Sequence, residues 1–201
     1  QPHGLKLRRR TQIRCAHQFR RFGYKSIDQM LREPQDVLHR PVYHINQAEK
    51  QALLTINLRD GLAKDEDGNS QIDRALVFSR TKHGSDRIVR HLMTAGIPAA
   101  AIHGNKSQAQ RTAALSGFRQ GTVRVLVATD IAARGIDVSG VSHVYNFELP
   151  NVAEQYVHRI GRTARNGADG IAVSYVAPDE KPYLRDIERL TRVKLMPLPL
   201  P

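Results

Sequence analysis

Short runs of Val, Ile, Leu and Ala alternate with helical segments along most of this 201-residue chain, and that alternation limits the folds open to it. Buried strands are expected at residues 75–78, 99–102, 123–128, 143–147 and 171–176, with a shorter one at 42–45. The segments between most of these runs are long enough to cross back as helices, which parallel strands require. Right-handed crossovers of this kind cover both faces of a sheet. The sequence therefore predicts an α/β domain with three layers, α/β/α, around a mostly parallel sheet.

The helices expected between the strands have recognisable ends. They are predicted at residues 47–62, 81–94, 107–119 and 179–191, with one more beginning after Asn151. Gly96 ends the second of them. Ser107 and Gln110 form a capping box at the start of the third. Asn151 is expected to cap the next helix, in which Glu154 takes the third position.

The formal net charge of +12 is concentrated at the start of the chain. Of the 31 Lys and Arg, eight lie in residues 1–27, which hold no acid, so the rest carries 23 bases against 19 acids. We predict a basic arm or remnant of a preceding domain over 1–40, a domain over 41–195 and a Pro-rich tail over 196–201 that extends as polyproline II. The arm is compatible with a flexible nucleic-acid-binding tail, a processed or misread segment, or an organellar transit peptide.

Other features of the composition restrict the compartment and the class of protein. No apolar stretch approaches the roughly 20 residues that span a bilayer, so no membrane contact is expected. Cys15 is the single cysteine and has no partner for an internal disulfide. A reducing, cytoplasmic setting follows. The nine histidines show no ligand-like clustering, and no metal site is expected on this chain.

The run at residues 158–165, His-Arg-Ile-Gly-Arg-Thr-Ala-Arg, is the most specific chemical feature of the sequence. Its arginines at 159, 162 and 165 follow one another at intervals of three, with no acid among them. The planar guanidinium carries a fixed charge and a fork of donors matched to phosphate oxygens. The run therefore suits a polyphosphate whose charge grows during cleavage. The alternative is a solvated basic face.

Further blocks precede this run in a fixed order: Leu-Val-Phe-Ser-Arg-Thr-Lys at 76–82, His-Gly-Asn-Lys-Ser-Gln-Ala-Gln-Arg at 103–111, and Val-Ala-Thr-Asp-Ile-Ala-Ala-Arg-Gly-Ile-Asp at 127–137. With the run at 158–165 they resemble motif IV, the QxxR element, motif V and motif VI of the C-terminal RecA-like domain of DEAD-box RNA helicases. The residues in these four motifs are most similar to those of the bacterial RhlE-like branch. The resemblance is specific over residues 74–165 and looser to about residue 195.

The resemblance implies a RecA-like fold of the P-loop NTPase type and a nucleotide site shared with another domain. Arg162 and Arg165 resemble the arginine fingers that reach the γ-phosphate of ATP. The other nucleotide-binding positions implied are Gly135, Asp137, His158 and Arg159. The Mg²⁺ that accompanies ATP would be held by the N-terminal RecA-like domain. Without the family, residues 134–137 read as a turn, because Gly and Asp favour turns.

The resemblance also implies an RNA surface that contacts phosphates and 2′-hydroxyls and is indifferent to sequence. The candidates are Arg80, Thr81, Gly104, Gln108, Arg111 and Thr129. Helix N-termini there could hold phosphates through free backbone N–H groups. From composition alone, residues 108–111 read as an ordinary exposed first turn of a helix.

No Walker A, Asp-Glu-Ala-Asp or Ser-Ala-Thr motif occurs in the sequence, and Gly104 to Ser107 fails as a P-loop because Asn105 stands where Gly must precede Lys. We therefore expect the second domain of an ATP-dependent RNA helicase, monomeric and catalytically incomplete alone. A stand-alone RNA-binding or regulatory module is the alternative, and a DNA-directed superfamily 2 helicase is a further one.

Overall fold

The structure is a computed structural model that describes residues 38–134, 136, 140–163 and 170–201. Contacts between Cα atoms divide the chain into two units, Gln1–Val37 and Leu38–Pro201. All of the described residues belong to the second unit. None of the helices in its described residues has the length and apolar character needed to cross a bilayer.

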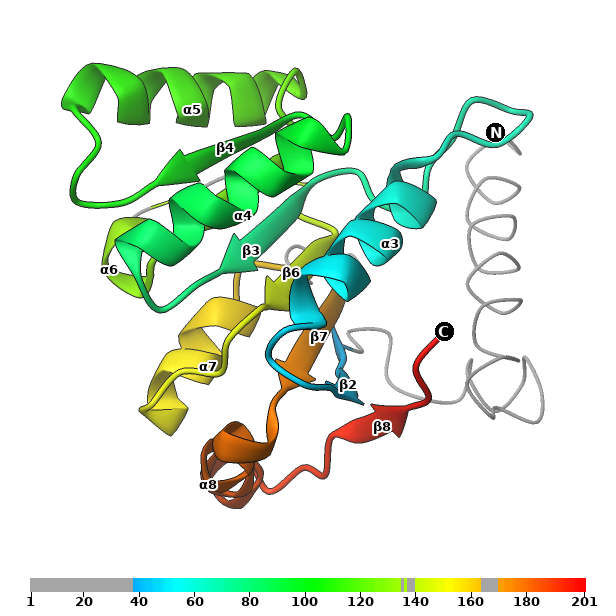
Figure 1. Ribbon diagram of the computed structural model, residues 1–201, viewed down its shortest axis with the longest axis vertical. Helices are drawn as coiled ribbons and strands as arrows, with labels where there is room; N and C mark the ends of the chain where they lie inside the picture. The colour runs from blue at the N-terminus through cyan, green and yellow to red at the C-terminus, as the bar shows by residue number, and fades with distance from the viewer. Residues whose placement is uncertain (1–37, 135, 137–139, 164–169) are drawn as a thin grey trace, which may run out of the picture. The chain divides into compact units, whose positions relative to one another are not determined.

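An eight-stranded sheet forms the centre of this unit, and every strand pair in it is parallel (Figure 1). The strand order is β4-β5-β3-β6-β7-β2-β8, and β1 pairs with β7. The strands are β1 Leu38–His39, β2 Pro41–His44, β3 Ala75–Phe78, β4 Ala99–Ile102, β5 Val125–Ala128, β6 His143–Asn146, β7 Gly170–Val176 and β8 Met196–Leu198. Fully buried Val, Leu, Ala and Phe in β3 and β5 account for the continuous apolar runs in the sequence.

Helices cover both faces of this sheet. They are α3 Lys50–Leu62, α4 Lys82–Thr94, α5 Gln108–Gln120, α6 Asp130–Ala133, α7 Ala153–Ile160 and α8 Lys181–Thr191, with a 3₁₀ turn, η1, at Pro178–Glu180. Leu76 and Phe78 of β3 share one apolar cluster with α5, α7 and α8. The helices α3 and α4 lie outside that cluster, and Figure 1 shows α4 in front of β3 and β4. The predicted three-layer α/β/α architecture is confirmed.

The structure confirms most of the strand positions and helix ends that were predicted from the sequence. The strands at 75–78 and 99–102 have the predicted bounds, and the bounds of the other predicted strands differ by at most two residues at either end. The capping box at α5 is present: Gln110 N donates to Ser107 Oγ at 3.2 Å, and Ser107 N donates to Gln110 Oε1 at 2.9 Å. Gly96 follows α4 with a φ of +78°, a conformation that glycine adopts at little cost.

Asn151 does not cap α7, contrary to the sequence prediction. The residue before α7 is Val152, and no side chain there bonds a free N–H of the helix. The side-chain oxygen of Asn151 instead accepts a hydrogen bond from the guanidinium of Arg80 at 3.1 Å. A long-range partner has therefore replaced the local cap, which sequence spacing does not reveal.

The Pro-rich tail is also different from its prediction. Residues 196–198 form β8, which pairs in parallel with β2 instead of extending as isolated polyproline II. Met196 N donates to Arg40 O at 3.2 Å, and Pro197 lies opposite Val42. Because β8 is an edge strand, the missing N–H of Pro197 can face away from the ladder. The prolines also keep this edge from recruiting another strand.

A buried ion pair joins α3 to the 3₁₀ turn η1 that precedes α8. Lys50 Nζ contacts Glu180 Oε2 and also donates to Phe147 O at 3.0 Å, and both side chains are fully buried. Glu180 further accepts from Leu149 N at 3.1 Å and Ala177 N at 2.9 Å. Burial lowers the pKa of Lys50, although Glu180 acts against that shift.

Replacing Glu180 should therefore destabilise the domain strongly. Glu180→Ala leaves the Lys50 ammonium buried without its carboxylate, which costs about 3–5 kcal/mol. The free energy of unfolding, measured by urea denaturation, should fall by that amount. Asp179→Ala changes the exposed neighbour and should cost less than about 0.5 kcal/mol. Equal effects from the two substitutions would contradict the role given to Glu180.

His143 should make the domain sensitive to mild acid. Burial lowers its pKa to about 4, whereas an unfolded histidine titrates near about 6.5. As the pH falls from about 6.5 to 4, the unfolded chain takes up the proton first, so stability is lost across that window by up to about 3 kcal/mol. His143→Gln should flatten the pH profile of unfolding free energy there. The exposed His91 offers a control as His91→Gln, which should leave the slope unchanged.

Candidate functional site

The chemically active residues of the sequence gather where the parallel strands end. The carboxyl ends of parallel strands meet at one edge of the sheet, where α/β proteins bind their ligands. The arrowheads of β3 and β4 point to the same side (Figure 1). The loops that follow β3, β4, β5 and β6 begin with Ser79, His103, Thr129 and Phe147. We call this the C-terminal edge.

Arg159 makes several hydrogen bonds at this edge. It lies in the last turn of α7 with 1% of its surface exposed. Its Nε and Nη2 donate to the two carboxylate oxygens of Asp130 at 2.6 and 2.7 Å. Its Nη1 donates to Asn146 Oδ1 at 3.3 Å and to Glu148 O at 2.7 Å. The guanidinium also lies 4.9 Å from the centre of the Phe78 ring.

These contacts make Arg159 a link inside the domain. It joins α6, which follows β5, to the loop after β6 and to its own helix α7. Bidentate pairing fixes the guanidinium plane as well as its position. Asp130 lies in the block at 127–137, but no local pattern in the sequence indicated its partner. The predicted nucleotide contact of Arg159 stays a prediction, and most of its donors are occupied within the domain.

Arg162 lies beside the block at 127–137. Its Nη1 donates to Ile136 O at 2.9 Å, and its side chain is half-buried. Thr163 attaches the end of this run to the segment before β6, because its hydroxyl lies 2.6 Å from Val141 O and 3.0 Å from Ser142 O. The structure thus brings one predicted arginine finger next to motif V. His158 is exposed on α7. The predicted residues Gly135, Asp137 and Arg165 lie outside the described residues.

The start of α4 holds Thr81 in a fixed rotamer. Gly84 N donates to Thr81 Oγ1 at 3.0 Å, so the threonine caps the helix and keeps its hydroxyl proton for another acceptor. A Cβ on Gly84 would lie 2.7 Å from both Ser79 Oγ and Thr81 Oγ1. Gly84 therefore permits the close packing that positions this predicted RNA-binding residue.

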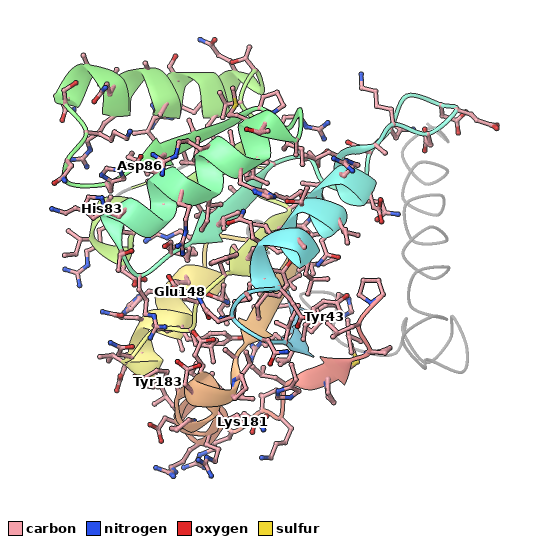
Figure 2. All side chains as sticks on the ribbon, in the orientation of Figure 1. Tyr43, His83, Asp86, Glu148, Lys181 and Tyr183 are labelled. Carbon is pink, nitrogen blue, oxygen red and sulfur yellow. The ribbon has the colours of Figure 1, made fainter. Side chains whose placement is uncertain are left out.

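The guanidinium of Arg80 is occupied by groups of the domain itself. It contacts Asn151 as described above, reaches Glu180 Oε1 at 3.3 Å, and lies 5.8 Å from the centre of the Tyr183 ring. Its backbone N donates to Glu148 Oε2 at 2.8 Å. Figure 2 labels Glu148 and Tyr183 on this side of the molecule. An RNA contact by Arg80 stays a prediction, and such a contact would have to compete with these partners.

The loop after β4 is attached to α4. His103 is almost fully buried, and its Nε2 lies 3.0 Å from Asp86 Oδ2, close enough for an ion pair although the angle is not that of a good hydrogen bond. The other carboxylate oxygen of Asp86 lies 2.9 Å from Lys106 Nζ. Partial burial acts to raise the pKa of Asp86, but the contacts with His103 and Lys106 outweigh it and lower that pKa. Figure 2 labels Asp86 on α4.

Most of the predicted RNA-binding residues lie on this part of the C-terminal edge. Gly104 and Gln108 are exposed, and Arg111 lies one turn after Gln108 on α5. Thr129 N donates to Ile102 O at 3.4 Å, which brings the loop after β5 beside the loop after β4. The structure therefore gathers Gly104, Gln108, Arg111 and Thr129 at neighbouring strand ends. Sequence reasoning missed Asp86, whose role depends on residues far along the chain.

The parallel sheet and the residues at its C-terminal edge define the class of this protein: it is a RecA-like α/β domain of the helicase type. Residues 49–167 match the model of the helicase conserved C-terminal domain. The chain belongs to that family, in the form found in DEAD-box RNA helicases.

Curated relatives support the same assignment. The chain is 50% identical over 127 residues to the ATP-dependent RNA helicase CshA of Listeria monocytogenes, which covers 63% of this chain and 24% of that protein. It is 51% identical over 121 residues to the DEAD-box helicase CshA of Bacillus subtilis, covering 60% of this chain and 24% of that protein. The chain thus spans about a quarter of the length of these relatives. The finer prediction of an RhlE-like branch gains no support from them.

Solved structures of related domains are similar to this one. The E. coli DEAD-box protein SrmB, solved with the regulator of ribonuclease activity A, aligns with a TM-score of 0.72 and 34% identity over 82% of this chain and 92% of that one. Dbp5 of S. cerevisiae, bound to RNA and ADP BeF3, aligns with a TM-score of 0.72 and 28% identity over 82% of this chain and 42% of that one.

Arg159 should be intolerant of even a conservative change. Arg159→Lys keeps the positive charge but cannot form the forked contact with Asp130 or fill the space over Phe78. We expect the free energy of unfolding to fall by about 2–3 kcal/mol, measured by urea denaturation. Arg162→Lys is the matched control, since that half-buried side chain makes one described hydrogen bond, and it should cost less than about 1 kcal/mol. Similar costs at the two positions would contradict the structural role of Arg159.

Proposed function

We propose that this chain is the second domain of an ATP-dependent RNA helicase. It supplies Arg162 and Arg165 to an ATP held by the N-terminal RecA-like domain of the same protein, together with part of the surface that binds the RNA backbone. Closure of the two domains around ATP and RNA then separates a short stretch of duplex. The observation that carries this proposal is the position of Arg162 at the C-terminal edge, beside motif V.

The described residues are suited to a nucleotide phosphate. The Arg162 guanidinium donates through Nη1 to Ile136 O, and no other hydrogen bond of its side chain is made to the residues that the structure describes. Negative charge on the γ-phosphate oxygens grows during cleavage, and a guanidinium placed beforehand stabilises it. Arg159 would act through Asp130 by keeping α7 at the right distance from motif V.

Magnesium is assigned to the other domain. No group of three His, Cys, Asp or Glu side chains with metal-binding geometry occurs in the part of the chain that the structure describes. Bound Mg²⁺ would neutralise phosphate charge and orient the triphosphate. On this proposal its ligands come from the N-terminal domain, and this chain contributes cations.

The proposed RNA surface comprises the loops after β4 and β5 with the first turns of α4 and α5. Contacts with phosphates and 2′-hydroxyls would come from Thr81, Gly104, Gln108, Arg111 and Thr129, and such contacts predict binding without sequence preference. The similarity to Dbp5 bound to RNA and ADP BeF3 supports this assignment. We propose that the domain works as a monomer in the cytoplasm.

The proposal predicts ATP hydrolysis that depends on both domains. The chain alone should show no RNA-stimulated ATPase. Joining it through a flexible linker to the N-terminal domain of a CshA-type helicase should produce activity, measured by phosphate release with and without RNA. Arg162→Ala should reduce the turnover number by about 10³-fold, the smaller end of what arginine fingers contribute. Arg192→Ala, at an exposed arginine after α8, should leave turnover unchanged.

Two results would contradict this function. RNA-stimulated turnover by the highly purified chain alone would show that it carries a complete ATPase site. Linked domains that bind RNA but hydrolyse no ATP would favour the stand-alone RNA-binding module.

A further inference from the structure

The outer face of helix α4 carries a row of basic side chains. His83, Arg87 and Arg90 follow one another at intervals of four and three residues, so they lie along one side of the helix. All three are exposed, and Figure 2 labels His83 on this helix. Ile88 and Leu92 on the opposite side are fully buried, where α4 packs on β4 and β5. One side of α4 therefore belongs to the core, and the other presents positive charge to solvent.

The domain does not neutralise the arginines of this face. Like charges three residues apart on a helix repel each other, and Arg87 and Arg90 have that spacing. Asp86 is the one acid in α4, and its carboxylate pairs with His103 and Lys106. Within the described part of the chain, no ion pair or hydrogen bond joins the guanidinium of Arg87 or Arg90 to another residue. Both charges are therefore available to a ligand.

Helix α3 extends the face of α4. The two helices lie on the same side of the sheet (Figure 1), and Arg59 Nη2 of α3 donates at 3.4 Å to the backbone oxygen of Ala95, the residue after α4. Ile56 precedes Arg59 by three residues, so both lie on one side of α3, and 43% of the Ile56 surface is exposed. Asp60, the acid of α3, lies about 100° further round that helix. We call Ile56, Arg59, His83, Arg87 and Arg90 the α3–α4 face.

The residue types on this face favour an acidic protein over a nucleic acid. Neither α3 nor α4 contains Phe, Tyr or Trp, on which the bases of a single strand would stack. The exposed Ile56 offers apolar surface that a phosphate backbone would leave uncovered. Arginine is enriched at protein–protein interfaces, whereas lysine is depleted there. Arg90 also lies about 10 Å along α4 from His83, away from the C-terminal edge at which the helix begins.

We propose that the α3–α4 face binds an acidic segment of another protein, in which Asp or Glu side chains flank an apolar one. The carboxylates pair with the forked donors of Arg87 and Arg90, and the apolar side chain covers Ile56. Complementary charge of this kind speeds the encounter and excludes basic partners. No residue of the face belongs to the proposed ATP or RNA sites, so this inference does not depend on the proposed function.

The experiment maps where an acidic peptide binds on the full 201-residue chain. A peptide of repeated Glu-Glu-Leu triplets is titrated into isotope-labelled chain, and the amide chemical shifts are followed residue by residue. This readout separates the α3–α4 face from the basic start of the chain, which attracts acidic peptides through charge alone. We expect the amides of α3 and α4 to shift. An all-glutamate peptide of the same length should bind there about fivefold more weakly, because it cannot cover Ile56.

Two double variants test the charges. Arg87→Gln combined with Arg90→Gln removes both arginine forks, and the peptide affinity read from the amides of α3 and α4 should fall about tenfold. Lys181→Gln combined with Arg185→Gln is the matched control, since it removes two exposed charges one turn apart on α8. That control should leave the shifts in α3 and α4 unchanged.

A single variant tests the apolar contact. Ile56→Ser should weaken binding of the Glu-Glu-Leu peptide about fivefold and leave binding of the all-glutamate peptide unchanged. Because Ile56, Arg87 and Arg90 are exposed, all these variants should fold, and urea denaturation checks this.

Three results would overturn the inference. The first is a set of shifts confined to residues outside α3 and α4. The second is an equal loss of affinity in the two double variants, because the effect would then be one of net charge. The third is an oligouridine that shifts the same amides more strongly than the peptide and loses this effect in the Arg87 and Arg90 variant, since the face would then bind RNA. The proposed function is tested separately, by the ATPase activity of the linked domains.

Discussion

The buried contact between Arg159 and Asp130 is the interaction on which the rest of the candidate site depends. Removing an arginine and a carboxylate from water is costly, and the pair is tolerated only where geometry and further hydrogen bonds compensate. Here Asn146 Oδ1 and Glu148 O accept from the same guanidinium, and the Phe78 ring lies against it. Any displacement of α7 relative to β5 would lose several of these contacts together. The pair therefore contributes more to the position of motif VI than to the net stability of the domain.

A second buried network supports the neighbouring part of the C-terminal edge. Glu180 receives Lys50 from α3, Arg80 from the loop after β3 and two backbone N–H groups. Glu148 connects this network to that of Arg159, because its carboxylate accepts from Arg80 N while its backbone oxygen accepts from Arg159. The loops after β3 and β6 are thus fixed before any ligand arrives. A site arranged in advance needs little reorganisation during the reaction, which is how fixed dipoles and charges become effective.

The sequence correctly predicted features that depend on residues close together in the chain. Its predictions were wrong where a residue distant in the chain binds the same side chain. Strands 75–78 and 99–102 and the Ser107 capping box were predicted correctly, because burial period and cap chemistry are local. The same local logic assigned Asn151 to a helix cap, yet Asn151 accepts a hydrogen bond from the distant Arg80 instead. The tail was predicted as isolated because nothing in its composition indicates the free edge of β2. The family resemblance identified Arg159 as important but not the Asp130 contact that explains its position.

On the proposed function, the distribution of charge at the C-terminal edge accounts for the need for a partner domain and ligands. The described acids near this edge each form an ion pair with a basic side chain of the domain itself: Asp86, Asp130, Glu148 and Glu180. Arg162 is held by a neutral backbone oxygen, and no ion pair joins it to an acid among the described residues. Exposed like charges repel one another, and water compensates them less well as the edge is covered. Closure against a second domain would therefore be unfavourable for the empty edge and favourable with a triphosphate and an RNA backbone in place. On the proposed function, ATP binding and RNA binding are coupled because closure of the domains requires the negative charges of both ligands.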